Sequence, residues 1–349
     1  MLQYFLKRIL YSLSVILGVI VIVFFLFQGL GDPTRMLMGQ RSDLATQQNI
    51  KAELYLDQPL GKQLLFYLND ISPISIYSSA QIQSKNLKGF FWGTENKKIG
   101  VKVPYLRRSY QSKKDVMDIL MDALPGTLML ASASMLLAIL LGIPLGVLSA
   151  IKKDTWWDST ALFTSILGIS APSFFMGIII SYLFGVVWSN VTGLHMNGSW
   201  ITVDAFTGPH ISMKNLILPA ITLGIRPLAI ITQLTRSAML DAMQQDYIRT
   251  ARAKGIKNIR IIWHHAFRNA LNPVITAVTG WFAELLAGSF FVETIFGWKG
   301  IGKITVDALE KLDFPIVIGA VLLTSFFVVC MNLIADLLYA YTDPRIRLH

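Results

Sequence analysis

The sequence predicts an all-α polytopic membrane protein with about six transmembrane helices and a long extracytoplasmic segment after the first helix. Of its 349 residues, 53% are hydrophobic and only 15% are charged, and the mean hydropathy is +0.53. A soluble domain usually has about 25% charged residues, so this chain has too few to coat itself in water. Apolar runs of about 20 residues recur, and each can cross roughly 30 Å of hydrocarbon.

The first apolar run, Ile9–Leu30, follows Lys7 and Arg8 and could therefore be a signal peptide. It is longer than the 7–15 residues of a signal core, and no A-x-A site follows it. We interpret residues 1–30 as a retained transmembrane helix. The other five predicted spans are Leu120–Ile151, Thr160–Trp188, Asn215–Thr235, Asn272–Val292 and Pro315–Tyr341.

Prolines interrupt two of these spans, at Pro144 and Pro172. Proline removes a backbone donor and kinks a helix, and in a membrane the freed carbonyl needs a neighbouring group or water. Kinked helices often line the path of a transporter, which makes Pro172 a candidate pathway residue. A kink that serves only packing is an equal alternative.

The distribution of Lys and Arg predicts that both termini are cytoplasmic. With the N-terminus inside, the cytoplasmic segments hold 13 of these residues and the short external loops hold four. Another 13 lie in the external segment 31–118, which is too long to count in this rule. An excess of Lys and Arg marks the cytoplasmic side of a membrane protein. The net charge of +10 is therefore explained by topology, and we expect no nucleic-acid partner.

The long segment 31–118 is the only sizeable hydrophilic region, and we expect it to form a small extracytoplasmic lobe. Apolar residues have helix-like spacing from Ser42 to Leu68, with a break at Pro59-Leu60-Gly61. From Ile71 to Tyr110 no period dominates. Residues 119–341 form the predicted transmembrane core, and residues 342–349 a cytoplasmic tail.

A basic cytoplasmic loop, residues 236–270, follows the fourth span. Its run Asp246–Ile256 suits a short helix. Gly255 could end this helix by adopting a left-handed backbone conformation. A second short helix can follow, with apolar Ile259, Ile261, Ile262 and Trp263. Two short helices around a glycine make a surface that a partner can grip. A solvated basic loop is the alternative, but such a loop would not need so many apolar residues.

Several stretches resemble one family of membrane proteins. The run D-Y-I-R-T-A-R-A-K-G from Asp246, followed by H-A-F-R-N-A-L-N-P ending at Pro273, is similar to the EAA loop of permeases in binding-protein-dependent ABC importers. The form is that of the dipeptide, oligopeptide and nickel permeases, and the resemblance covers nearly the whole chain. Further matching stretches are Gly31–Pro33, Leu56–Leu60, Leu124–Leu128, Gly142–Gly146, Pro172–Gly177, Val292–Gly302 and Asp343–Arg347.

Two features depart from the general family pattern. The positions of the motif's Glu-Ala-Ala are Arg249, Thr250 and Ala251, as is common in the peptide and nickel branch. The stretch Ile71–Val103 is longer than usual for the family. The missing glutamate shifts the expected contact from an acidic anchor to shape and apolar burial around Gly255.

The resemblance implies a type I-like importer fold and an alternating-access permease in the bacterial inner membrane, surrounded by lipid. Its expected partners are a homologous second permease, two ABC ATPase subunits that bind ATP and Mg, and an extracytoplasmic solute-binding protein. Peptides are the expected cargo, and nickel or a nickel chelate is the alternative. The residues expected to couple to the ATPases are Asp246, Tyr247, Ile248, Thr250, Ala251, Ala253, Lys254, Gly255, Ile256 and Ile259.

Catalytic and metal sites are not predicted for this chain. Gly297–Ile304 nearly matches a phosphate-binding loop, but Ile304 stands where a hydroxyl must reach Mg²⁺, and the topology places the segment outside the cell. The adjacent His264 and His265 would point about 100° apart on a helix. The single cysteine, Cys330, lies in an apolar run and suits a small buried hydrophobe. We therefore predict a non-catalytic subunit with no cofactor of its own.

Two ionisable residues fall inside predicted spans, Arg226 in the fourth and Glu284 in the fifth. Such groups are costly in a membrane and usually face a partner or a pathway. We expect them to approach one another or to line the translocation path, although either side chain could instead extend to an interface. Two other functional classes remain, a self-sufficient channel or secondary transporter and a membrane-embedded enzyme. The first predicts inverted repeats, and no clear repeat relates the two halves of the sequence. The second predicts clustered catalytic polar residues within spans, and the sequence shows no such cluster.

Overall fold

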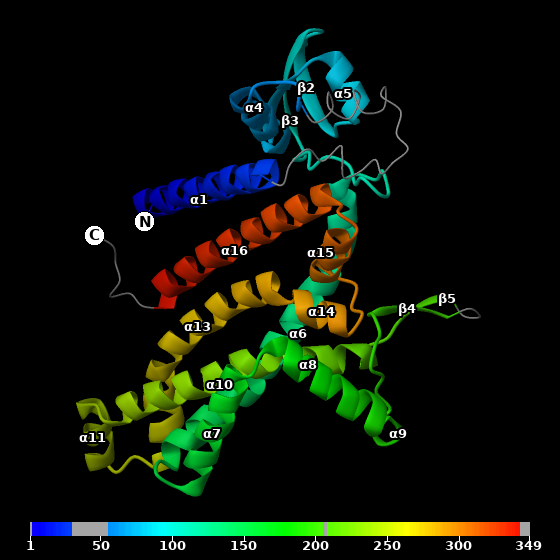
Figure 1. Cartoon of the computed structure of the whole chain (residues 1–349). Coiled ribbons are helices and arrows are strands. Elements are labelled where there is room, and N and C mark those ends of the chain that lie inside the picture. Colours follow the sequence, from blue (N-terminus) through cyan, green and yellow to red (C-terminus); the bar gives the residue numbers. More distant parts are fainter. Residues whose placement is uncertain (1, 30–54, 205–207, 343–349) are drawn as a thin grey trace. The chain divides into compact units, whose positions relative to one another are not determined.

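The computed structural model describes residues 2–29, 55–204 and 208–342, and most of them are helical (Figure 1). Within these ranges, five helices are long and apolar enough to cross a membrane, or six if one bent pair counts as a single span. The predicted set of about six membrane helices is thus confirmed. The predicted motifs Gly31–Pro33 and Asp343–Arg347 lie outside the described residues.

The helices that contribute most of the candidate membrane spans in the described residues are α1 (Leu2–Gly29), α6 (Val116–Ile151), α7 (Trp156–Ser170), α8 (Ser173–Tyr182), α10 (Lys214–Met243), α13 (Phe267–Gly288) and α16 (Phe314–Thr342). The remaining described helices are α4 (Leu60–Ile71), α5 (Ser79–Lys85), α9 (Ser189–Thr192), α11 (Asp246–Ala253), α12 (Asn258–Arg260), α14 (Phe290–Ile295) and α15 (Ile301–Glu310), with π-helical turns η1 (Leu183–Val187) and η2 (Ile261–Ala266). The strands are β1 (Ile74–Tyr77), β2 (Gly89–Thr94), β3 (Lys97–Lys102), β4 (Ile201–Asp204) and β5 (Gly208–Ile211).

The chain divides into two compact units. The first unit comprises Met1–Ser12, Ala123–Lys303 and Phe326–His349, and the second comprises Leu13–Asp122 and Ile304–Ser325. The long helices α1, α6 and α16 each contribute residues to both units.

In the first unit, α10 packs against α7, α8 and α13 (Figure 1). Small residues let α6 and α10 approach closely, because a Cβ at Gly224 would lie 2.9 Å from the carbonyl oxygen of Ser134. Close packing of small residues is the usual device of membrane helices, which have no hydrophobic driving force between them. The core of this unit is built from buried Leu130, Met135, Ile180, Leu223, Ile231, Val274, Leu285, Phe296 and Trp298.

The third predicted span is broken where the sequence predicts only a kink. Helices α7 and α8 meet at an angle of 106°. Pro172 is the N-cap of α8, and Ala171 before it is extended with ψ of 127°. Because a proline disfavours helical geometry in the residue before it, the chain leaves the helix here. By contrast, α6 continues through Pro144.

The second unit contains a small sheet that the sequence does not predict. Its strand order is β1-β3-β2, and both pairings are antiparallel. One face of the sheet carries two cross-strand rows, Ile74–Val101–Phe90 and Ile76–Ile99–Trp92, all exposed in this chain. On the other face, Tyr77 donates a hydrogen bond to the Asp70 carboxylate over 2.7 Å. Strand periodicity is hidden in the sequence because each strand has only four to six residues.

Candidate functional site

The predicted coupling loop forms a short helix that a glycine ends. Helix α11 spans Asp246–Ala253, and Gly255 follows it with φ of +74°. The amide of Gly255 donates to the Arg252 carbonyl over 2.9 Å, and the amide of Ile256 donates to the Ala251 carbonyl over 3.2 Å. These two bonds form a Schellman motif, in which a left-handed residue satisfies the last carbonyls of a helix. The helix and its glycine stop agree with the prediction from the sequence.

The inner side of α11 is anchored in the first unit. Ile248 and Ala251 are buried among apolar residues of α6, α10 and η2. Both are in the predicted set of coupling residues, but their side chains are covered by the chain itself. They therefore hold the loop in place and do not offer a surface. The residues that complete this cluster are Val147, Ala150, Met239, Ala242, Ile261, Ala266 and Ala270.

The outer side of the loop presents the rest of the predicted set. Tyr247 is 39% exposed and Ile259 is 63% exposed, although both are apolar enough to be buried. Trp263, which lies in η2 and is absent from the predicted set, is 48% exposed and packs edge-to-face on Phe267. An apolar strip with exposed aromatic rings is typical of a protein contact. The other predicted residues on this side are Asp246, Thr250, Ala253, Lys254 and Gly255, all exposed, and the half-buried Ile256.

A buried ion pair, which sequence reasoning missed, connects the helices beside this loop. Arg236 of α10 donates to both carboxylate oxygens of Asp158 in α7, over 2.6 and 2.7 Å. The Asp158 carboxylate also accepts the hydroxyl of Ser149 in α6 and the amide of Asp154. Three helices are thereby joined through one carboxylate. Both charged residues stand at the ends of predicted spans, and that position alone could have indicated them.

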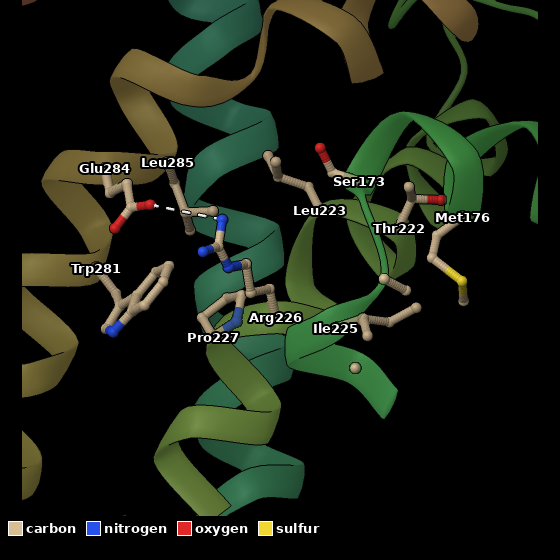
Figure 2. A pocket seen from close by; sticks show the side chains of 12 residues that line it. Ser173, Met176, Thr222, Leu223, Ile225, Arg226, Pro227, Trp281, Glu284 and Leu285 are labelled. Atoms are coloured by element: carbon tan, nitrogen blue, oxygen red, sulfur yellow. Dashed lines mark ion pairs between the residues drawn. The ribbon is translucent and has the colours of Figure 1, made fainter. Parts of the chain in front are cut away.

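The two ionisable residues of the predicted spans do approach one another. A guanidinium nitrogen of Arg226 lies 3.9 Å from a carboxylate oxygen of Glu284, and each side chain is 54% exposed. The guanidinium lies 5.4 Å from the ring centre of Trp281. Figure 2 shows this pair beside a pocket, with Trp281 on the Glu284 side and Ser173 and Met176 across from it. Glu284 lies near the end of α13, closer to a helix end than the predicted span placed it.

The break between α7 and α8 contributes the far wall of the pocket. Ala171 and Ser173, which flank Pro172, both line it together with Met176. Pro172 itself is exposed and is the N-cap of α8. The predicted pathway residues Arg226 and Glu284 thus share one pocket, and the third, Pro172, shapes its wall. The complete lining is Gly168, Ala171, Ser173, Met176, Thr222, Leu223, Ile225, Arg226, Pro227, Trp281, Glu284 and Leu285.

The glycine-rich segment Gly297–Ile304, which nearly matches a phosphate-binding loop, surrounds the carboxylate of Glu293. Glu293 is fully buried, and it accepts the amide of Lys303 over 3.0 Å and the hydroxyls of Thr127 and Ser289 over 2.7 Å each. A Cβ on Gly300 or Gly302 would collide with this carboxylate. Burial raises the pKa of Glu293, while its hydrogen bonds oppose that shift. The segment is therefore a structural turn around a carboxylate.

In the described part of the chain, no group of three or more His, Cys, Asp or Glu side chains is placed to bind a metal ion. The rings of His264 and His265 are nearly perpendicular, at 89°. Cys330 is half-buried in α16.

Comparison with known proteins gives the family. Residues 142–348 match the binding-protein-dependent transport system inner membrane component family, and residues 1–83 match the N-terminal region of such membrane components. The dipeptide transport system permease protein DppB of Escherichia coli K12 is 34% identical over 367 aligned positions, covering 99% of both chains. The di/tripeptide permease protein of Pseudomonas aeruginosa is 33% identical, and the glutathione permease protein GsiC of Pectobacterium atrosepticum is 34% identical, each over 99% of both chains.

Solved structures support the fold. A chain of the MetNI methionine ABC transporter in an inward-facing conformation matches with a TM-score of 0.50 and 16% identity, covering 65% of this chain and 97% of that one. A chain of an amino acid ABC transporter has the same TM-score at 14% identity. This chain is a multi-pass inner membrane protein that belongs to the family of binding-protein-dependent transport system inner membrane components.

Proposed function

We propose that this chain is the permease subunit of an ATP-driven importer of short peptides and forms half of the translocation path. The observation that carries the proposal is the full-length similarity to permeases named for dipeptides, di/tripeptides and glutathione. The same relatives favour peptides over nickel as the cargo. A homologous second permease forms the other half of the path, and an extracytoplasmic binding protein delivers the solute.

Two ATPase subunits supply the energy, and their ATP and Mg are bound outside this chain. The permease itself is non-catalytic. The ATPases grip the outer side of the coupling loop, through Tyr247, Ile259 and the residues around Gly255. Two features support this assignment, the exposed apolar side chains of the loop and its similarity to the docking loop of the family.

The coupling loop works as a stiff connection. Ile248 and Ala251 tie α11 to α6 and α10, so a push on its outer side displaces these helices. The Asp158–Arg236 pair extends the connection to α7. A loosely held loop would absorb the motion of the ATPases, whereas a packed one transmits it. Reorientation of the spans then exposes the path to the two sides of the membrane in turn.

A cross-linking experiment tests the docking assignment. Cys330 is replaced by alanine, and single cysteines are placed at Tyr247, Ile259 or, as an exposed control outside the loop, Lys153. The tagged permease is purified with its associated proteins after treatment with a short cysteine-to-lysine cross-linker. We expect an ATPase subunit to co-purify with each variant and to be cross-linked only from Tyr247→Cys and Ile259→Cys.

Two results would overturn the assignment. Purification of the permease without any ATPase subunit would refute the proposed function as an ATP-driven importer. Cross-linking from Lys153→Cys alone would leave an ATPase partner but move its docking surface away from α11.

A further inference from the structure

The ion pair in the pocket differs from the ion pair between Arg236 and Asp158. Arg236 and Asp158 make two bonds of 2.6 and 2.7 Å, and the Asp158 side chain is 4% exposed. Arg226 and Glu284 have one N–O distance of 3.9 Å, at the limit of an ion pair. The first pair is closed and structural. The second is loose and half exposed, so both of its charges remain available to a ligand.

Arg226 is held in position, and within the described residues only the loose Glu284 contact engages its N–H donors. The Trp281 ring lies beside its guanidinium, a cation–π contact that fixes the group without occupying its N–H bonds. A guanidinium has five N–H donors in a fork that fits a carboxylate. At the other end of the pair, the Glu284 carboxylate can accept several hydrogen bonds and suits an ammonium group.

The rest of the pocket wall contributes the N-terminus of helix α8, which carries a positive partial charge, and several apolar side chains. Helix α8 begins at Ser173 on the far side of the pocket, and the first N–H groups of a helix have no partner inside it. Its N-terminal end also carries a positive partial charge. Met176, Leu223 and Leu285 supply an apolar lining. The pocket therefore combines one anion-binding side, one carboxylate and room for an apolar side chain.

From this arrangement, and resting on the proposed function of peptide import, we propose that Arg226 and Glu284 form a transient binding site for peptides with free termini. Arg226 takes the terminal carboxylate and Glu284 takes the terminal ammonium. An extended dipeptide spans at most about 7 Å, so a modest separation of the loose pair admits both termini. A ligand with one charge only would meet repulsion from one member of the pair.

Weak binding suits this place. Half-exposed charges are screened by water, so each contact contributes little. A site inside a path must bind well enough to admit the solute and weakly enough to release it. A tight, buried pair such as Asp158–Arg236 could not fulfil both conditions.

The test uses the permease pair assembled with its ATPases, without ATP and without the binding protein. A dipeptide with free termini that contains benzoylphenylalanine photolabels the complex. Unlabelled dipeptide, its N-acetyl derivative and its C-terminal amide compete for labelling. The variants are Arg226→Gln and Glu284→Gln, and Lys214→Gln serves as an exposed charge control on the same helix as Arg226. Uptake of dipeptide with the binding protein is measured in parallel.

We expect each blocked derivative to compete about threefold to fivefold more weakly than the free dipeptide in the wild type and in Lys214→Gln, as fits charge contacts that are screened by water. Arg226→Gln should accept the amide as well as the free peptide, within twofold, yet still reject the N-acetyl derivative. Glu284→Gln should show the reverse. If a glutamine variant does not assemble, Arg226→Lys and Glu284→Asp should retain both preferences.

Other patterns would overturn the site. One is equal competition by all three ligands in the wild type, and another is absence of labelling in a complex that imports dipeptide. A third is a glutamine variant that keeps, or loses, its discrimination against the amide and against the N-acetyl derivative together. A wild-type complex that imports no peptide would instead refute the proposed function.

Discussion

Individual charged side chains in the first unit differ in what surrounds them, and this difference assigns their roles. Asp158 is closed in by Arg236, Ser149 and the Asp154 amide. Buried charges of this kind are destabilising when one partner is removed, because the other remains uncompensated. Arg226 and Glu284 are open to a ligand and should contribute little to stability.

Replacing Asp158 by Asn should therefore destabilise the protein by about 3 kcal/mol, since the partly buried Arg236 would lose the carboxylate to which it donates both hydrogen bonds. Denaturant unfolding of the purified protein measures this change. The neighbouring variant Asp154→Asn is the control, because the Asp154 side chain is 81% exposed and its contact with Lys153 is 3.9 Å long. Equal stability of the two variants would show that the pair does not hold α7 to α10.

Glu293 gives a prediction on pH. Burial raises its pKa above the ordinary value of 4.5, so the folded protein holds this proton more firmly than the unfolded chain. The group's contribution to stability is complete below pH 4.5 and is lost as pH rises through the folded pKa. We expect the difference in Tm between wild type and Glu293→Gln to shrink from pH 4.5 upwards. A constant difference between wild type and Glu293→Gln across this pH range would contradict the burial argument.

At the scale of elements, sequence periodicity predicts the long helices because each carries a continuous apolar run. It also predicts α11 and its stop, since Gly255 follows a short helical pattern. It predicts neither the 106° break at Pro172 nor the sheet β1-β3-β2. A proline gives the same local pattern whether it kinks or ends a helix, and packing decides the outcome. The energetic cost of a charge inside a membrane was enough to predict that Arg226 and Glu284 approach one another. The positions of Asp158 and Arg236 at the ends of predicted spans could have indicated these residues, but their pairing depends on how three helices meet.

Gly255 tests the coupling loop as an element. A Cβ there would meet nothing within 4 Å, so only backbone strain acts against a larger residue at φ of +74°. Val should cost at least about 1–2 kcal/mol at this position, distort the turn and lower the peptide imported per ATP hydrolysed. Asn tolerates the left-handed region and should keep coupling near the wild-type level. The ratio of uptake to hydrolysis in the assembled transporter measures the effect. An unchanged ratio in Gly255→Val would mean that the turn does not transmit motion.

At the scale of the whole molecule, the account requires the coupling loop to be cytoplasmic and the sheet-containing lobe to be outside. Ile259 and Trp92 are similarly exposed, at 63% and 67%, so single cysteines at these positions are a matched pair. A membrane-impermeant maleimide should label Trp92→Cys in spheroplasts, and Ile259→Cys only after permeabilisation. Labelling of Ile259→Cys in intact spheroplasts would reverse the proposed topology.

The central claim is that this chain moves peptides only as part of an ATP-driven complex. The most direct measurement is uptake of a radiolabelled dipeptide into proteoliposomes that contain the permease pair and its ATPases, with the binding protein added outside the membrane. We predict uptake that requires ATP, the binding protein and this chain together. Dipeptide flux through this chain alone, without the ATPases, would contradict the account and indicate a self-sufficient channel or secondary transporter.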